Sequence, residues 1–338
     1  MLIVPDDNYS KQWRKGDRLI NISDKIRAKL SELPMKPGVY KMIDNKGNVI
    51  YVGKSKMLNK RVKIYFTHNP EWDKIKRMVK MIDNIEFIVT DTHLEARLLE
   101  CSLIKELKPV FNSQMKHDRG YVYVKLEDYN KHRALSVVES REENSFGPFR
   151  KRYYLNETVK SLRYLYPIVK KDDSYFFEYH IFPVNLNELE FNENRNSLYE
   201  ILTNDSEARI FINELEKKMK NEAASHNFER ASLFKDILNN VNYLVNSLNR
   251  YKELLKRDVI LSIPLDEGLK LFYISKGLII KKEVIKAPRQ NDIEKFREAA
   301  LTSPDHYYIN MDEKSLIDFK DIICSEIITL PDSMVSYI

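Results

Sequence analysis

The stretch GVYKMIDNKGNVIYVGKS, residues 38–55, decides the fold of the first part of the chain. Val39–Ile43 and Val49–Val52 are short runs rich in apolar residues, as in β-strands. Asn45 and Gly47 lie in the polar segment between them, where they can supply the positive φ angles of a tight turn. The stretch therefore predicts a β-hairpin with a tyrosine on each arm.

Helices and one further strand are predicted around this hairpin. Residues 18–33 predict a short helix that ends before prolines. Apolar side chains at helical spacing predict two more helices, and these side chains are Leu58, Val62, Tyr65 and Phe66, then Trp72, Ile75, Val79 and Ile82. Ile85–Thr90 predicts a strand, and Thr92 with Glu95 forms a capping box for a helix through Leu107. The pattern predicts a small α/β module.

The charge of the chain is uneven. The 338 residues carry a net charge of +6, but residues 1–125 carry +10 and the remainder carries −4. A basic half is where a polyanion such as nucleic acid is expected to bind, although basic helices are often only solvated faces.

Cysteine content and hydropathy restrict the class of protein. The two cysteines, Cys101 and Cys324, are too few and too far apart for a metal knuckle or a disulfide framework. The apolar runs are far shorter than a membrane span, and the N-terminal residues lack the apolar core of a signal peptide. These features predict a protein of a reducing cytoplasm with no membrane partner.

Four residues near the hairpin could attack a phosphodiester together. A phenol such as Tyr40 or Tyr51 can donate or accept a proton, and its pKa can fall beside a cation. Lys54 follows the second arm, and Arg61 can bind two phosphate oxygens with its planar fork. The alternative is that both tyrosines are ordinary strand aromatics.

Glu100 is the candidate metal ligand of this set. It has the apolar neighbours Ala96, Leu103 and Ile104 on one predicted helix, and a carboxylate among apolar side chains is costly unless it is paired or bound to a cation. Exposure to solvent, or pairing with Arg97 or Lys105, is the alternative.

The order GVY, YVG, arginine-bearing helix and glutamate-bearing helix resembles the GIY-YIG nuclease motif. The segments LPMKPGVYKMIDNKGNVIYVGKSKMLNKRVKIYF, THLEARLLECSLIKELKPVFN and YVYVKL are similar to the N-terminal half of the UvrC family, the incision subunit of bacterial nucleotide excision repair. The architecture is also similar to Cho, a short UvrC homologue.

The resemblance implies a role for each site residue. Tyr51 would act as general base toward a water, Tyr40 would orient water or phosphate, and Lys54 would hold Tyr51 reactive or contact the phosphate. Arg61 would stabilise charge on the phosphate, and Glu100 would bind a single divalent cation, Mg²⁺ or Mn²⁺. A further residue, Asn112, would complete the site.

Residues 205–250 predict two helices that meet near Ser225–Asn227. The pattern resembles the UVR motif, by which UvrC pairs with UvrB, and the alternative is an ordinary helical hairpin. The resemblance implies UvrB as a partner, with UvrA involved indirectly. The predicted contact residues are Leu215, Met219, Ala223, Phe228 and Ala231.

Two features of UvrC proteins are missing from the sequence. The segment that carries a four-cysteine iron–sulfur cluster in many UvrC proteins has no cysteine here, so no such cluster is expected. We also expect residues 251–338 to lack the catalytic acids of an RNase H-like nuclease.

We therefore predict five parts: a helical lead, residues 1–33; a GIY-YIG endonuclease domain, 34–115; a connecting domain, 116–204; the hairpin, 205–250; and a small C-terminal α/β domain, 251–338. In the last part KLFYISKGLIIKKEVI predicts a hairpin and NDIEKFREAAL a helix. The predicted fold class is α/β (α+β), with a central antiparallel or mixed sheet flanked by helices in the nuclease domain.

The predicted function is a cytoplasmic, nucleoid-associated bacterial endonuclease that nicks damaged double-stranded DNA on the 3′ side of a lesion after UvrB has marked the site. A non-catalytic UvrB-binding adaptor and a UvrB-independent, structure-selective nuclease are the alternatives. The residues expected to contact phosphates are Lys56, Lys60, Lys63, Lys74, Lys76, Arg77 and Lys80.

Overall fold

The computed structural model describes residues 22–66, 73–116, 120–129, 133–182, 184–289, 291–302, 304–305, 307–308 and 311–338. The chain forms two compact units, one of residues 1–117 with 253–338 and one of residues 118–252. The start of the predicted 18–33 helix and Trp72 lie outside the described residues. The predicted division into five parts stays a prediction.

The first unit begins with the predicted hairpin. Strand β1 (Gly38–Ile43) pairs antiparallel with β2 (Val49–Ser55) and with β3 (Asn84–Val89), which gives the strand order β2-β1-β3. In the turn Gly47 has a φ of 82°, whereas Asn45 is not among the residues of positive φ, so the expectation for Asn45 was wrong. Asp44 takes the structural role instead, because its carboxylate accepts the backbone N–H groups of Lys46 and Asn48.

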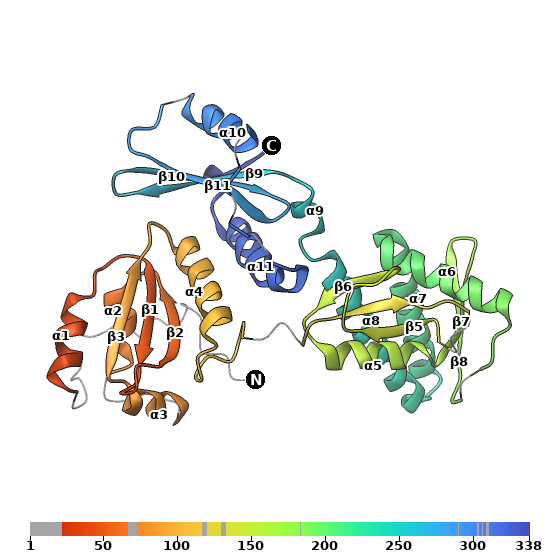
Figure 1. The fold of residues 1–338 in the computed structure, drawn as a ribbon. Helices are drawn as coiled ribbons and strands as arrows, with labels where there is room; N and C mark the ends of the chain where they lie inside the picture. The colour runs from red at the N-terminus through yellow and green to blue at the C-terminus, as the bar shows by residue number, and fades with distance from the viewer. Residues whose placement is uncertain are drawn as a thin grey trace. The chain divides into compact units, whose positions relative to one another are not determined.

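Four helices surround this sheet (Figure 1). They are α1 (Asp24–Glu32), α2 (Leu58–Ile64), α3 (Asp73–Met81) and α4 (His93–Leu107). The capping box of Thr92 and Glu95 is present, which confirms that prediction. Because side chains alternate along a strand, Tyr40 contributes to a core on one sheet face while Val39 packs against α4 on the other.

The C-terminal residues form the rest of the same unit. Their sheet has the order β11-β10-β9-β12, and its strands are β9 (Val259–Leu265), β10 (Gly268–Ser275), β11 (Leu278–Ile285) and β12 (Val335–Tyr337). The predicted hairpin and helix are confirmed as β10–β11 and α10 (Asp292–Thr302). Helix α11 (Glu313–Thr329) packs against α4, as Figure 1 shows, and a turn of 3₁₀-helix, η2 (Asp332–Met334), precedes β12.

The second unit has its own core of strands and helices. Two small antiparallel sheets contain β5-β4-β6 and β7-β8, and the strands are β4 (Val122–Leu126), β5 (Leu135–Val138), β6 (Ser145–Phe149), β7 (Leu165–Lys171) and β8 (Ser174–Tyr179). The helices are α5 (Arg152–Leu162), α6 (Glu188–Thr203), α7 (Asp205–Ala224) and α8 (Phe228–Asn249). A short helix, α9 (Lys252–Leu255), follows where the chain returns to the first unit.

The mixed α/β class is thus confirmed. None of the helices within the described ranges combines the length and the apolar character that crossing a bilayer requires.

Candidate active site

Three buried tyrosine rings form the centre of the candidate site. Tyr40 lies on β1, Tyr51 lies on β2, and Tyr65 directly follows α2; their exposed fractions are 1%, 8% and 5%. The ring centroids are 6.0 to 6.1 Å apart in all three pairs. The hydroxyls of Tyr40 and Tyr65 are 2.9 Å apart, and the Tyr65 hydroxyl donates to that of Tyr51 at 3.4 Å. The three hydroxyls therefore form one continuous chain.

Gly53 makes room for this cluster. It lies opposite Tyr40 in the β1–β2 register. A Cβ atom at position 53 would lie 2.4 Å from the Tyr40 hydroxyl oxygen and 2.9 Å from the Tyr51 ring. The Tyr40 ring occupies the space above Gly53, so any side chain at position 53 would displace a tyrosine of the candidate site.

The pKa values of the two predicted tyrosines differ from expectation. Burial raises the pKa of Tyr40 and of Tyr51 well above the ordinary value, and the neighbouring Tyr65 raises both further. The nearby guanidinium of Arg61 acts in the opposite direction on the pKa of Tyr40 but is outweighed. In the protein alone the expected lowering by a cation is therefore outweighed, because desolvation of the phenols dominates.

Arg61 brings a fixed positive charge to the cluster. Its guanidinium carbon lies 5.7 Å from the centre of the Tyr65 ring, which suits a cation–π contact. Burial lowers the pKa of Arg61, but the tyrosines Tyr40, Tyr65 and Tyr51 outweigh burial and raise it overall. The guanidinium stays charged and can face a phosphate.

Glu100 and Lys54 meet between α4 and β2. The backbone N–H of Lys54 donates to Glu100 Oε1 at 3.0 Å, and Lys54 Nζ lies 3.8 Å from Glu100 Oε2. Both side chains keep contact with solvent, at 19% and 14% exposure. Tyr51 precedes Lys54 by three residues on β2, and its ring belongs to the core on the sheet face opposite α4. The Glu100 charge is the smallest of the causes that raise the pKa of Tyr51.

The alternative partners of Glu100 on α4 have strong partners of their own. Arg97 Nη1 lies 2.6 Å from Glu326 Oε2, and Lys105 Nζ lies 2.8 Å from Asp318 Oδ2.

Asn112 acts on the strand that carries Tyr51. Its Oδ1 accepts the Val52 backbone N–H at 2.9 Å, and its Nδ2 donates to the Val52 carbonyl at 2.8 Å. The next backbone contact is from the Phe111 N–H to the Ile50 carbonyl at 3.0 Å. Asn112 therefore fixes the backbone of β2 on the residue next to Tyr51.

Sequence reasoning missed Tyr65 as a site residue. It was assigned only to the apolar face of a helix, and its hydroxyl in fact joins those of Tyr40 and Tyr51. The signal was its position four residues after Arg61, because residues at that spacing share one helix face.

The predicted phosphate contacts lie on and next to α2 and α3. Most are exposed, whereas Lys63 and Lys74 are half-buried, and Lys76 pairs with Asp73 at 3.7 Å. Lys116 was not predicted, yet burial and the charge of Lys74 lower its pKa, which shows that the two ammonium groups are close.

The helical hairpin of the second unit consists of α7 and α8. Leu215 is fully buried in the core of that unit, so it supports the hairpin and offers no contact surface to a partner, contrary to expectation. Ala231 is also buried, whereas Met219 and Ala223 are half-buried. Phe228 at the start of α8 is 65% exposed. Of the five predicted contact residues only Phe228 is largely accessible. The apolar periodicity selected residues that pack between the two helices together with the exposed residue at the start of α8.

The comparisons with known proteins agree with this geometry. Residues 36–113 match the family model of the UvrC-like GIY-YIG domain. The chain is 31% identical over 280 residues to UvrABC system protein C of Acetivibrio thermocellus, which is 76% of this chain and 44% of that protein. It is 42% identical over 150 residues to UvrABC system protein C of Caldanaerobacter subterraneus, or 42% of this chain and 24% of that protein.

A solved structure is similar in sequence to the same region. It is the GIY-YIG N-terminal endonuclease domain of UvrC from Thermotoga maritima, bound to its catalytic divalent cation, magnesium. It is 38% identical, covers 27% of this chain and 100% of that one, and gives a TM-score of 0.26.

Residues 36–113 thus form a GIY-YIG domain. Within that class the domain is UvrC-like, and the chain is a UvrC-like protein. It spans less than half the length of the curated relatives it matches.

Proposed function

We propose that the protein is a divalent-metal-dependent endonuclease of nucleotide excision repair, which nicks one strand of damaged DNA on the 3′ side of a lesion after UvrB has marked the site. One observation carries the proposal: Glu100 of α4 binds β2 at Lys54, three residues after Tyr51, at which the buried hydroxyl chain ends. The relatives' name, UvrABC system protein C, supports the repair context.

The residues at Glu100 suit a hard divalent cation. Within the described part of the chain no group of three or more histidine, cysteine, aspartate or glutamate side chains is arranged to hold a metal. One carboxylate with water as the remaining ligands suits Mg²⁺, which keeps several waters, and Mn²⁺ accepts the same oxygen ligands. When bound, the cation would supply positive charge against the charge that develops on the phosphate.

The side chains of the protein divide the remaining work. The raised pKa keeps Tyr51 protonated in the protein alone, so its hydroxyl first binds and orients a water or a phosphate oxygen. Positive charge at the site would lower this pKa, so that the phenol releases its proton to solvent and the resulting phenolate can accept the proton of the attacking water. Tyr65 donates to Tyr51 and holds its hydroxyl in place. Arg61 stabilises negative charge on the phosphate, and Asn112 keeps β2 in register.

The predicted cations on and near α2 and α3 would contact the DNA backbone. Such contacts release counterions, so DNA binding falls steeply as salt rises. The exposed Phe228 at the start of α8 is the proposed anchor for UvrB, since exposed aromatic side chains are frequent hot spots of protein interfaces.

A nicking assay tests the enzyme. Labelled lesion-containing duplex is incubated with UvrB, Mg²⁺ and either the wild-type protein or Glu100→Gln. We expect a single nick on the 3′ side from the wild type and almost none from Glu100→Gln. The matched control is Glu106→Gln, an exposed glutamate of the same helix, which should cleave normally. Equal cleavage by wild type and Glu100→Gln would refute the metal site, and no cleavage by any variant would favour an adaptor.

A binding measurement tests the partner. Phe228→Ala should weaken UvrB binding in a titration, whereas Phe176→Ala, at another exposed phenylalanine on β8, should not. If Phe228→Ala binds UvrB as wild type does and nicks without UvrB, the protein is a UvrB-independent nuclease.

A further inference from the structure

Helix α4 is enclosed by two layers of the first unit. One face, with Ala96 and Ile104, packs on the sheet of β1 and β2. Another face packs on the C-terminal residues in a separate core, to which α4 contributes Leu94, Leu98 and Cys101 and α11 contributes Phe319, Ile322, Ile323 and Ile327. Leu94 and Cys101 are 0% exposed. The C-terminal residues thus bury an apolar face of the helix that carries Glu100.

Two ion pairs fix α11 along this face. Arg97 donates to Glu326 at 2.6 Å and to Ser325 Oγ at 2.7 Å. Lys105 lies 2.8 Å from Asp318, whose side chain is only 5% exposed. Buried pairs of this kind specify one register, because any other placement leaves a charge without its partner.

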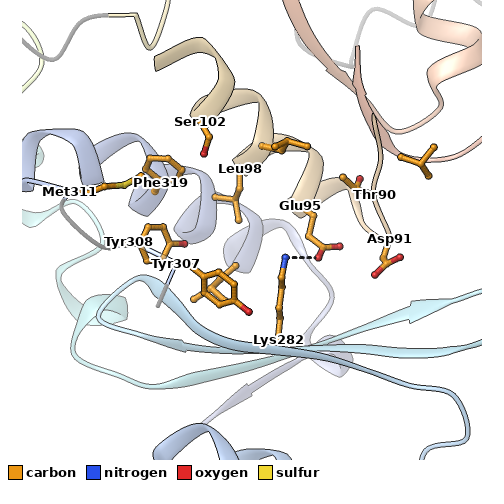
Figure 2. A pocket seen from close by; sticks show the side chains of 13 residues that line it. Thr90, Asp91, Glu95, Leu98, Ser102, Lys282, Tyr307, Tyr308, Met311 and Phe319 are labelled. Atoms are coloured by element: carbon orange, nitrogen blue, oxygen red, sulfur yellow. Dashed lines mark hydrogen bonds and ion pairs between the residues drawn. The ribbon is translucent and has the colours of Figure 1, made fainter. Parts of the chain in front are cut away.

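A third group of charges holds the N-terminal end of α4. Glu95, the capping-box residue, binds Lys282 of β11 at 3.0 Å (Figure 2). It also binds Lys270 of β10 at 3.1 Å. Lys270 also donates to Asp91 at 2.8 Å, and its side chain is 8% exposed.

The packing is not continuous along the whole length of α4. A cavity of about 440 Å³ lies beside α4, between the Glu95–Lys282 pair and the apolar contact at Phe319 (Figure 2). Tyr307 and Tyr308 line its far side. Where the cavity separates the layers, van der Waals contacts are missing, so the charged pairs carry more of the placement of the helix.

We infer that residues 253–338 are a positioning module for α4, and that Arg97 and Lys105 act through the helix to set the Glu100 carboxylate and thereby the affinity for the divalent cation. This inference rests on the proposed function. Glu100 lies between Arg97 and Lys105 on one rigid helix, and its carboxylate must meet the Lys54 backbone N–H at hydrogen-bond distance. A small rotation of α4 would break that contact, just as loss of residues that orient a ligand weakens metal binding elsewhere.

Terbium binding to the full chain tests the inference without any cleavage. Tb³⁺ takes hard oxygen ligands, and the tyrosine cluster beside Glu100 can sensitise its luminescence. We expect Arg97→Glu to weaken Tb³⁺ binding by about 10- to 100-fold. The double variant Arg97→Glu/Glu326→Arg should regain most of the affinity, because the pair is restored with its charges exchanged. A control is Lys25→Glu, which breaks the exposed Lys25–Asp83 pair away from α4 and should leave binding unchanged.

Hydrogen exchange of the α4 and β2 backbone amides gives a second measurement. Exchange there should quicken in Arg97→Glu and return in the double variant. If Arg97→Glu fails to fold, the milder Lys105→Gln should show the same effects at smaller size. Unchanged Tb³⁺ affinity and unchanged exchange in a folded variant would overturn the inference. If the wild type itself binds Tb³⁺ no better than Glu100→Gln, the metal site of the proposed function fails, and hydrogen exchange still decides the positioning of α4.

Discussion

Both units of the molecule bury a tyrosine in an aromatic cluster, but the two hydroxyls have different partners. In the first unit the Tyr40 hydroxyl meets that of Tyr65, which in turn meets Tyr51. In the second unit Tyr175 packs edge-on against Phe211, and its hydroxyl donates to Glu207 at 2.7 Å.

The difference separates the proposed active site from a cluster that stabilises the fold. Glu207 is itself neutralised by Lys170 at 2.7 Å, so the Tyr175 hydroxyl belongs to a closed set of opposite charges. The hydroxyl chain of the first unit instead ends at Tyr51, near Glu100 and Arg61. The Tyr175 hydroxyl is bound to a neutralised carboxylate, which stabilises a fold, whereas the hydroxyls of the first unit bind one another and the Arg61 guanidinium.

The largest expected effect is a difference in nicking activity between variants of Tyr51 and Tyr175. Tyr51→Phe removes the proposed proton acceptor, so kcat for nicking should fall by about 10² to 10⁴-fold, the usual contribution of a positioned acid or base. Tyr175→Phe should leave kcat unchanged. The measurement is single-turnover cleavage of lesion DNA with UvrB, and a similar loss of kcat in both variants would remove the distinction.

The second prediction concerns the space around the hydroxyl chain. Gly53→Ala places a methyl group against Tyr40 and Tyr51, so we expect a loss of about 1–3 kcal/mol in the free energy of unfolding. Displaced reacting groups should also lower nicking by roughly a hundredfold. Urea unfolding and the nicking assay measure the two effects. Gly120→Ala, which meets nothing within 4 Å, serves as the control and should match wild type in both.

The third prediction is that Tyr175→Phe lowers the stability of the protein although it leaves nicking unchanged. Tyr175→Phe removes one hydrogen bond to Glu207, and we expect the free energy of unfolding to fall by about 1 kcal/mol. Thermal unfolding of this variant beside Tyr153→Phe, whose side chain is 72% exposed, checks the prediction. An unchanged melting temperature for Tyr175→Phe would mean that its hydroxyl adds nothing to the fold.

The smallest effect is a pH dependence of the second unit. Hydrogen bonds from Lys170, and then from Tyr175, lower the pKa of Glu207 below its ordinary value. The ionised form is therefore favoured by folding, so its stabilisation is present above the ordinary glutamate pKa of about 4.3 and is lost as pH falls through the lower native value. Melting temperatures between about pH 5 and pH 3 should fall less steeply in Glu207→Gln than in wild type. Parallel curves would contradict the assignment.

Local patterns in the sequence predicted much of the fold. The hairpin of residues 38–55, the capping box of Thr92 and Glu95, and the break at Ser225–Asn227 depend on neighbours a few residues apart, and all three are present. The docking of α11 on α4 could not be predicted, because Arg97 and Glu326 are distant in sequence and either charge alone resembles a solvated surface residue.

The sequence suggested several residues of the candidate site, but it did not suggest Tyr65 or the electrostatics of the cluster. Glu100 was selected because a carboxylate among apolar neighbours is costly in free energy unless it is paired or bound to a cation. The raised pKa values of Tyr40 and Tyr51 depend on burial by the whole core, which no motif reveals. Likewise Leu215 could not be told from a partner-facing residue, because helical periodicity identifies an apolar face without showing what covers it.

The amide of Asn112 also has a consequence for the solution behaviour of the protein. Strand β2 is an outer strand of its sheet, and an outer strand presents unpaired backbone groups on which another chain can add. Asn112 and Phe111 occupy such groups at Val52 and Ile50. The strand that carries Tyr51 can therefore stay at the edge of the sheet without pairing with the strand of a second copy of the protein.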